Sequence, residues 1–291
     1  MEIKINGKNA DITLENEKTV GEVLSGIQDW LENSGFYLSG LEIDGKSYGA
    51  QSLDAAFELP VEGLSCLDIK TSGWADLLLE ALTGLRRDLE LYEKATPEEK
   101  ALFAGEWALS APALFLKDNE KPLYDTMLDI LKNGGENVSA FNIKAASLLV
   151  SERIREIEAP YQEMKNLQPL AEETAKRLED LPLDMQTGKD SKAAETITVF
   201  SSLIEKIFRL IFLFKYFKTD IESIEVPSMN GSGKQNLKDY IGEFSSALKE
   251  LISAFENKDS VLVGDLAEYE LAPRLRSLTE VLCGNNPGVN I

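Results

Sequence analysis

The apolar and polar positions of this chain change their period near residue 73. Before this point, apolar residues alternate with polar ones or stand in short runs, which is typical of β-strands. After it, they recur every three or four residues, as on amphipathic helices. The pattern therefore predicts an α+β protein with a small mixed domain at residues 1–72. An all-α helical bundle of roughly five to eight helices follows at residues 73–291, with a sub-boundary expected near residues 133–138.

The most apolar helical pattern lies at residues 194–217. Two neighbouring stripes contain Ile197, Phe200, Ile204, Ile207, Ile211 and Phe214, and Val199, Leu203, Leu210 and Phe217. In the last two turns Phe212, Leu213, Phe214, Tyr216 and Phe217 leave no polar strip. A helix that is apolar all round is covered by other helices, by a partner or by lipid. Because Glu205, Lys206, Arg209 and Lys215 interrupt the stretch, we expect no membrane span here.

The first 72 residues contain the signals of a small mixed sheet. Two alternating runs, residues 2–6 and 11–15, flank an Asn-Gly turn and predict a hairpin. Thr19 and Glu22 have the spacing of a helix capping box, and the apolar face of the helix that follows includes Trp30. Further strands are expected at residues 41–44, 46–48 and 65–71, with one helical turn at residues 52–57.

The run IDGKSYGAQSLDAAFELPVEGLSCLDIKT, together with this order of elements, resembles the second half of ubiquitin-like β-grasp domains. The resemblance covers residues 1–72. Modifiers of that family end in a free Gly-Gly carboxylate, whereas this segment ends Thr71-Ser-Gly-Trp74 and continues into a helix. The resemblance therefore implies a fused domain, which either offers a sheet face, a sheet edge and a helix for docking or packs as a structural cap.

Prolines and glycines divide the helical part. Residues 181–188 are expected to form a loop and residues 226–234 a flexible linker. The cleanest amphipathic helix is expected at residues 237–255 as a neighbour of the apolar helix, and the last helix is expected to begin after Asp259 and to bend at Pro273. The segment DSVLVGDLAEYELAPRLRSL resembles the closing part of uncharacterised bacterial proteins, which indicates a bacterial source.

Composition removes several kinds of chemistry. The chain has no histidine, which excludes Ser-His-Asp and Cys-His catalysis, and its two cysteines are too few for a zinc site. Gly231-Ser-Gly-Lys234 lacks the earlier glycine and the following Ser or Thr of a phosphate-binding loop. Acidic groups such as Glu152, Glu156 and Glu158 are interpreted as solvated pairs with bases three or four positions away. We expect no cofactor and no metal.

Charge narrows the choice of partner. Fifty acidic and 30 basic residues give a formal net charge of −20, which repels phosphate backbones, so we expect no nucleic acid as a partner. A basic protein partner fits this charge, although solubility alone also explains it. The N-terminus lacks a basic and then apolar signal pattern, so the expected location is the cytoplasm.

The sequence therefore predicts a non-enzymatic interaction protein, an adaptor or chaperone-like binder. Its partner is another protein, basic or presenting an amphipathic helix, and the candidate surface is Phe212, Leu213, Phe214, Tyr216 and Phe217. The alternative for this cluster is core, closed over by Trp74, Trp107, Phe141 or the helices after Gly231. Two other functions stay open, namely a carboxylate-based enzyme with a site between the domains and a structural homo-oligomer.

Overall fold

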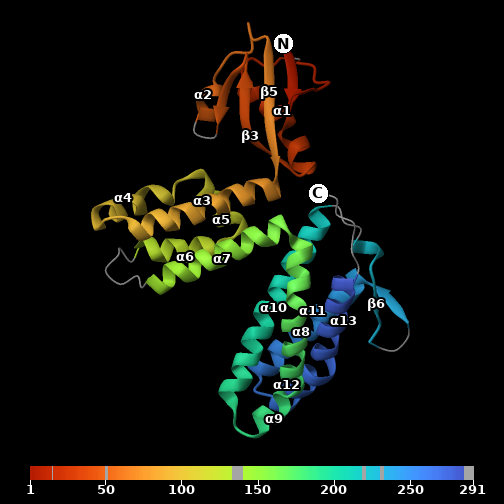
Figure 1. Cartoon of the computed structure of the whole chain (residues 1–291). Coiled ribbons are helices and arrows are strands. Elements are labelled where there is room, and N and C mark those ends of the chain that lie inside the picture. The colour runs from red at the N-terminus through yellow and green to blue at the C-terminus, as the bar shows by residue number, and fades with distance from the viewer. Residues whose placement is uncertain (15, 50–51, 133–139, 218–220, 230–232, 285–291) are drawn as a thin grey trace. The chain divides into compact units, whose positions relative to one another are not determined.

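A computed structural model describes residues 1–14, 16–49, 52–132, 140–217, 221–229 and 233–284 (Figure 1). The chain divides into two compact units, Met1–Ile154 and Arg155–Ile291. The sequence places its main boundary at residues 72/73, within one residue of the point at 73/74 where the last strand of the sheet runs directly into a helix. The expected sub-boundary near residues 133–138 lies outside the described residues.

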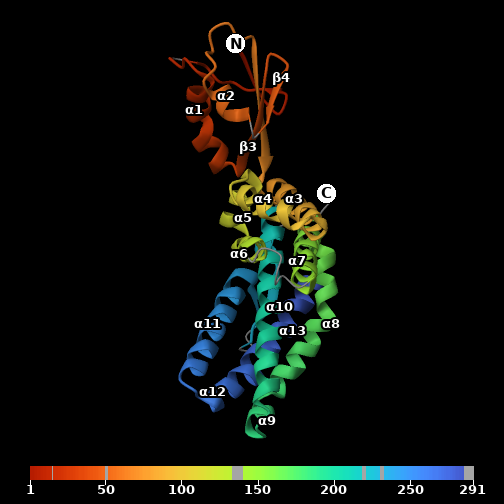
Figure 2. The same ribbon diagram turned by 90° about the vertical axis from the view of Figure 1, so that its left-hand side faces the viewer.

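The first unit begins with a five-stranded mixed sheet in the order β2-β1-β5-β3-β4. Strands β1 and β5 are parallel, and the other neighbours are antiparallel. Helix α1 packs against the sheet and α2 lies beside it (Figure 2). The elements are β1 (Glu2–Ile5), β2 (Lys8–Asn9), α1 (Val20–Asn33), β3 (Phe36–Ile43), β4 (Lys46–Gly49), α2 (Leu53–Phe57) and β5 (Cys66–Gly73).

Helix α1 begins where the sequence predicts it. Thr19 Oγ1 accepts a hydrogen bond from the backbone N–H of Glu22 at 3.3 Å, and the Glu22 carboxylate accepts one from the N–H of Thr19 at 3.4 Å. This confirms the predicted capping box. The buried residues of the domain come from α1, from α2 and from alternate strand positions: Ile3, Val20, Val23, Leu24, Ile27, Leu31, Leu41, Ile43, Ala56, Leu67 and Ile69. Trp30, which was expected on the apolar face of the helix, is instead 56% exposed.

Strand β3 is longer than β4, and its first residues extend past it. Strand β4 pairs with residues 40–43 of β3, whereas β5 pairs with β3 from Phe36 onward. The β3–β5 register shifts between Leu38 and Gly40, which leaves Ser39 as an extra residue in a β-bulge. Because a bulge bends its strand, the start of β3 turns away from the line of β4. Among the described residues, no strand lies beside residues 36–39 on the side opposite β5.

Five helices complete the first unit: α3 (Trp74–Lys94), α4 (Pro97–Trp107), α5 (Ala111–Asn119), α6 (Lys121–Lys132) and the first part of α7 (Ala140–Glu158), whose last four residues belong to the second unit. Helix α4 starts with proline at its first position, behind a capping box of Thr96 and Glu99. Tyr92 of α3 is buried, and its hydroxyl donates to the carbonyl of Ile130 of α6 at 3.3 Å. These contacts join helices that lie far apart in the sequence.

The second unit is mostly helical. It is not all-α, although the sequence predicts an all-α bundle. Its elements are α8 (Pro160–Glu179), α9 (Leu181–Gln186), α10 (Asp190–Tyr216), η2 (Ile221–Ser223), β6 (Glu225–Pro227), β7 (Lys234–Asn236), α11 (Leu237–Glu256), α12 (Ser260–Asp265), η3 (Leu266–Leu271) and α13 (Ala272–Gly284). Strands β6 and β7 form an antiparallel pair where a flexible linker was expected, and α9 occupies most of the expected loop. The helices α3 to α13 of the described chain outnumber the five to eight expected.

The long apolar helix α10 runs through the second unit, and Figure 2 shows it between α8 and α11. It packs against α8, and Phe244 of α11 lies against both Phe200 and Phe208 of α10, with ring centroids 6.4 and 6.3 Å apart. The predicted neighbour relation between the two helices is therefore confirmed. Tyr240 of α11 is fully buried and donates its hydroxyl to the carbonyl of Arg274 at 2.9 Å. Burial raises the pKa of Tyr240 to about 12.

The bend expected at Pro273 takes the form of a wide helical turn. Residues Leu266–Leu271 form a π-helix, η3, between α12 and α13. Proline has no N–H to donate, and its ring clashes with the carbonyl four residues earlier in a regular α-helix. A π-turn widens the helix just before the proline and relieves that clash. The sequence therefore predicts the place of the irregularity but not its kind.

Candidate functional site

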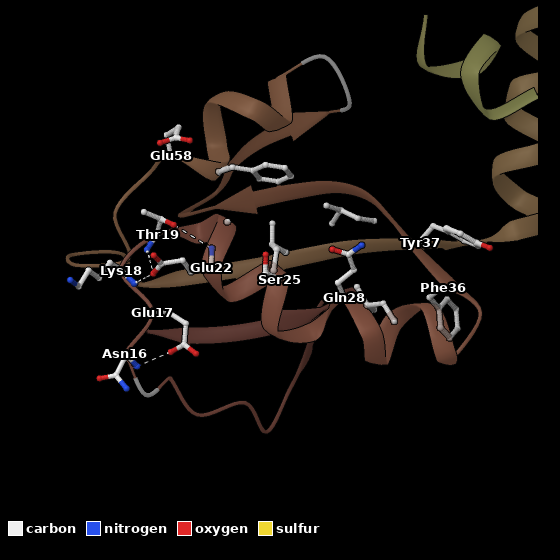
Figure 3. A pocket seen from close by; sticks show the side chains of 15 residues that line it. Asn16, Glu17, Lys18, Thr19, Glu22, Ser25, Gln28, Phe36, Tyr37 and Glu58 are labelled. Carbon is white, nitrogen blue, oxygen red and sulfur yellow. Dashed lines mark hydrogen bonds between the residues drawn. The ribbon is translucent and has the colours of Figure 1, made fainter. Parts of the chain in front are cut away.

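An open groove of about 1180 Å³ lies in the N-terminal domain between helix α1 and the start of strand β3 (Figure 3). We call it the α1/β3 groove. One face of α1 lines it at helical spacing with Gly21, Leu24, Ser25, Gln28 and Leu31. The opposite wall consists of Phe36, Tyr37 and Leu38 of β3 with Phe57 and Glu58 at the end of α2, and the groove is closed at one end by residues 16–19 and Glu22.

Charged side chains gather at one end of this groove. Figure 3 shows Glu17, Lys18 and Glu22 along this end, with Glu58 apart from them on the other side of the groove. The backbone before α1 pairs with the segment after α2 and brings these residues to the same end: the N–H of Val20 donates to the carbonyl of Leu59 at 3.0 Å, and the N–H of Val61 to that of Lys18 at 2.9 Å. Three carboxylates and one ammonium group leave this end of the groove negative.

Aromatic side chains occupy the other end. Phe36 and Tyr37 are 43% and 41% exposed and stand at the start of β3 (Figure 3). The sequence reasoning missed these residues because it starts the strand at residue 41. The signal was present as Phe36-Tyr37-Leu38, three residues of high strand propensity directly after Gly35. The sequence does not reveal the bulge at Ser39, which interrupts the alternation of buried and exposed positions along the strand.

A second and smaller groove, of about 560 Å³, lies on the other side of α1. It runs between the helix and the β1–β2 hairpin, and the exposed Trp30 lines it together with Ile5, Ile12 and Ile27. Trp30 thus contributes to a surface hollow rather than to the core. Lys8 of β2 and Asp11 both line this groove and balance each other in charge, whereas the rim of the first groove is negative.

The patch predicted at the end of the apolar helix divides between core and surface. Leu213 is 4% and Phe214 1% exposed, so both are core residues. Phe212 is 53% exposed, whereas Tyr216 and Phe217 are half-buried and meet edge to face at 5.4 Å. Helical spacing explains the division, because positions 213 and 214 lie on the side that faces the core of the unit and position 212 does not.

Phe212 lies in an open groove of about 340 Å³ between α10 and α11, which we call the α10/α11 groove. Its lining residues are Phe208, Ile211, Phe212 and Lys215 of α10, Ile221 of η2, and Leu237, Lys238 and Ile241 of α11. Helix α11 thus covers part of the predicted patch. Trp74 and Trp107, which were considered as alternative covers, make contacts within their own unit, to Asn119 and Tyr124. The side chain of Phe141 lies outside what the structure describes.

The sequence predicts that the acidic groups are solvated, but in the second unit some of them are buried. Glu156 is 1% exposed, and both of its carboxylate oxygens accept hydrogen bonds from Arg209, at 3.0 and 3.1 Å. Lys206 donates to Glu163 at 3.0 Å and lies 3.8 Å from Glu156. This cluster joins α7, α8 and α10 through paired charges, so it is structural in character. Exposed i,i+4 pairs also occur as predicted, including Glu173 with Arg177.

Other chemistry has little support in the described parts of the chain. No group of three or more Asp, Glu, Cys or His residues within those parts is placed to hold a metal ion. Cys283 is buried, and burial raises the pKa of its thiol, which disfavours the nucleophilic thiolate. Within the described residues, no helix combines the length and the apolar character that a bilayer crossing requires.

Two known families match separate segments of the chain. Residues 1–73, which contain the α1/β3 groove, match the TP0873 N-terminal domain. Residues 162–281, which contain the α10/α11 groove, match a domain of unknown function, DUF8042. An uncharacterised protein of Treponema pallidum (strain Nichols) is 25% identical over 289 residues, which cover 99% of this chain and 100% of that protein. No solved structure matches the chain. The chain is thus similar to a bacterial protein over its whole length, and it carries segments similar to the TP0873 N-terminal domain and to DUF8042, in this order.

Proposed function

We propose that this protein is a non-enzymatic adaptor that binds another protein through its N-terminal domain, and that this domain is a ubiquitin-like β-grasp. The β-grasp assignment is supported by the strand order β2-β1-β5-β3-β4, by the parallel pairing of the first and last strands, and by the helix between the hairpin and β3. Because the domain continues into α3 rather than ending in a free carboxylate, its role is docking and not conjugation.

The observation that carries this proposal is the α1/β3 groove. It combines an apolar floor, two exposed aromatic residues at one end and a charged rim at the other. Protein-binding sites typically have exposed aromatic anchors beside polar groups. Catalytic pockets, in contrast, hold acid and base groups that converge on one reacting atom. The described charged groups of this groove, Glu17, Lys18, Glu22 and Glu58, lie along its rim. The Glu22 carboxylate is held there by hydrogen bonds from the backbone N–H groups of Lys18 and Thr19, so the groove favours binding over chemistry.

The α10/α11 groove is a second candidate surface. Its apolar lining and the exposed Phe212 favour an amphipathic helix of a partner, which buries apolar residues at positions i, i+3 and i+4. Lys215 and Lys238 line the same groove, so a partner helix with acidic residues beside its apolar stripe suits it better than a basic one. The net charge of the chain favours a basic partner, whereas the lysines of this groove favour an acidic one.

Partner capture with matched variants tests the proposal. Ser25→Trp fills the α1/β3 groove from an exposed position of α1, whereas Asp29→Trp adds the same side chain to the same helix outside the groove. We expect a specific partner from the native host to bind the wild-type protein and Asp29→Trp but not Ser25→Trp. Direct binding of the purified partner, measured by calorimetry, completes the test. Equal binding to all three proteins would contradict the assignment of the site.

For the second surface, Phe212→Asp is the appropriate variant. The buried Phe214 is unsuitable, because a charge there would unfold the helix packing rather than report on binding. If Phe212 lies in a partner site, the variant keeps its thermal stability and loses the partner. If the groove joins copies of this chain, light scattering shows an oligomer that becomes a monomer in the variant, which supports the homo-oligomer instead.

The enzyme alternative stays a hypothesis about acidic residues. It requires a close pair of carboxylates with a raised pKa facing a cavity. In the described residues, the most buried acids, Glu156, Glu163 and Asp184, are each paired with basic groups. A carboxylate whose oxygens already accept hydrogen bonds from lysine or arginine is poorly placed to transfer a proton to a substrate. This favours the adaptor over the enzyme.

A further inference from the structure

We propose that the α1/β3 groove binds an extended, basic segment of another protein, which pairs as an added strand with residues 36–39 of β3. This inference rests on the proposed function and names the binding mode and the chemistry of the partner. It assigns the occupant a conformation, a register region and a charge, each of which has its own test.

The backbone at the start of β3 supplies the first argument. Strand β3 pairs with β5 from Phe36 to Ile43 except at Ser39, whereas among the described residues it pairs with β4 only over residues 40–43. Alternate residues of a strand direct their N–H and C=O groups to opposite edges, so part of the backbone of residues 36–39 points away from β5. An edge of this kind is a template for another strand. Phe36, Tyr37 and Leu38 line the groove, so the edge borders on it.

The shape of the groove supplies the second argument. An extended chain alternates its side chains between two sides at about 3.3 Å per residue. On one side of a strand added to β3 lies the α1 wall with its apolar Leu24 and Leu31, and Phe57 adds an apolar side chain to the wall opposite α1. The polar side chains of Ser25 and Gln28 rise from α1 toward β3 between these residues (Figure 3). An added strand can form hydrogen bonds with the backbone N–H and C=O groups of β3 and also place apolar side chains in the groove. A bound helix cannot form those backbone hydrogen bonds.

Charge supplies the third argument. The end of the groove opposite to Phe36 and Tyr37 carries Glu17, Glu22 and Glu58 against the single Lys18. Glu22 also accepts hydrogen bonds from the backbone N–H groups of Lys18 and Thr19, which holds its carboxylate at the rim. The protein as a whole is acidic, at −20, so a second copy of this chain is repelled from the same rim. Charge complementarity therefore selects a basic segment of a different protein.

Three synthetic peptides test the inference on the full-length protein. The first alternates valine and threonine over eight residues and carries lysines at one end; the second has glutamates in their place; the third is the lysine peptide with N-methyl groups on alternate amides. Backbone amide NMR of the labelled protein measures binding. We expect the lysine peptide to shift the signals of residues 36–39 and of the groove face of α1, and to slow hydrogen exchange at the start of β3.

The two other peptides separate the backbone contribution from the charge contribution. N-methylation blocks strand pairing on one edge, so that peptide should lose its binding. The glutamate peptide should bind about tenfold more weakly at low salt, and this difference should shrink as salt screens the rim. Glu58→Lys leaves two carboxylates and two ammonium groups at the rim, so it should abolish the preference between the lysine and glutamate peptides. Glu62→Lys, an exposed change in the same domain outside the groove, should leave it unchanged.

Several results would overturn strand addition. They are shifts that map away from residues 36–39, equal binding of the N-methylated peptide, or a dimer of the protein alone that Ser25→Trp converts to a monomer. If a native partner depends on Ser25 but leaves the amides of residues 36–39 unprotected, the proposed function holds and the added strand is rejected. If neither a partner nor a peptide depends on the groove, both proposals fail.

Discussion

Gly264 shows how closely two short helices meet in the second unit. It is buried in α12, and a Cβ built there would lie 3.1 Å from Cβ and 3.2 Å from Cγ of Pro182 in α9. A proline ring is rigid, so the neighbour has little freedom to retreat. Glycine is needed at this position for close approach rather than for an unusual backbone angle.

The contrast between two glycines gives a prediction. Gly264→Ala should destabilise the second unit by about 1–2 kcal/mol, because the added methyl group overpacks the contact with Pro182. Gly242→Ala should instead stabilise it by about 0.5–1 kcal/mol, because that glycine lies within α11 with open space around its Cβ position. Urea unfolding of both variants measures the difference. A stabilising effect at both positions would show that α9 yields to the methyl group.

Glu179 makes part of the stability depend on pH. Arg276 donates two hydrogen bonds to this carboxylate, one of them at 2.9 Å, and these bonds lower its pKa in the folded state. A lowered pKa contributes stability that is complete above the unfolded-state value of about 4.3 and is lost as the pH falls through the folded-state value. Glu179→Gln should therefore be less stable than the wild type at pH 7, with a difference that narrows below about pH 4. Urea midpoints at both pH values test this, with the exposed Glu280→Gln as the control.

At the scale of elements, patterns local in sequence were predictable and pairings distant in sequence were not. The capping boxes at Thr19 and Thr96, helix α11 and the bend at Pro273 each follow from residues within one or two turns of each other. The partner of Glu156 is Arg209, 53 positions away, and no local pattern identifies it. The start of β3 had a local signal in Phe36-Tyr37-Leu38, but its extension past β4 depends on where β4 stops pairing, which no local pattern identifies.

The buried charges at the end of α7 lead to a prediction about how the elements are held. Glu156→Ala should destabilise the protein by about 3 kcal/mol, because Arg209 and Lys206 lose a shared carboxylate in a largely buried cluster. Glu173→Ala removes an exposed i,i+4 pair with Arg177 and should change the stability far less, because solvent screens that pair. Chemical denaturation of the two variants compares them. Similar losses would show that burial of the Glu156 cluster adds nothing.

At the scale of the whole molecule, each of the two units has its own buried residues. Leu67 of β5 and Leu278 of α13 are both fully buried, one in each unit. We expect Leu67→Ala and Leu278→Ala to destabilise by about 2–5 kcal/mol each, and to lower different transitions in a calorimetric scan. A single transition that both variants lower equally would show that the units unfold together.

The two candidate grooves also differ in charge, which a net value of −20 conceals. The α1/β3 groove ends in three carboxylates, whereas two lysines line the α10/α11 groove. The net charge alone favours a basic partner and does not show that one of the two grooves is lined by lysines. This distribution becomes visible only when the fold brings residues 17, 22 and 58 together at one place and residues 215 and 238 at another.

The number of residues in the π-helix η3 determines which side of α13 faces the core. A π-turn holds one residue more than an α-turn, and one residue corresponds to about 100° of rotation around a helix axis. Helix α12 contacts α9 and α11, whereas α13, beyond the π-turn, contacts α8. Deleting one residue within Leu266–Leu271 would remove the extra residue of the π-turn and rotate Leu275, Leu278 and Leu282 by about 100° away from the neighbours against which they are buried. The extra residue therefore sets the rotation between α12 and α13, so that α12 packs against α9 and α11 while α13 packs against α8.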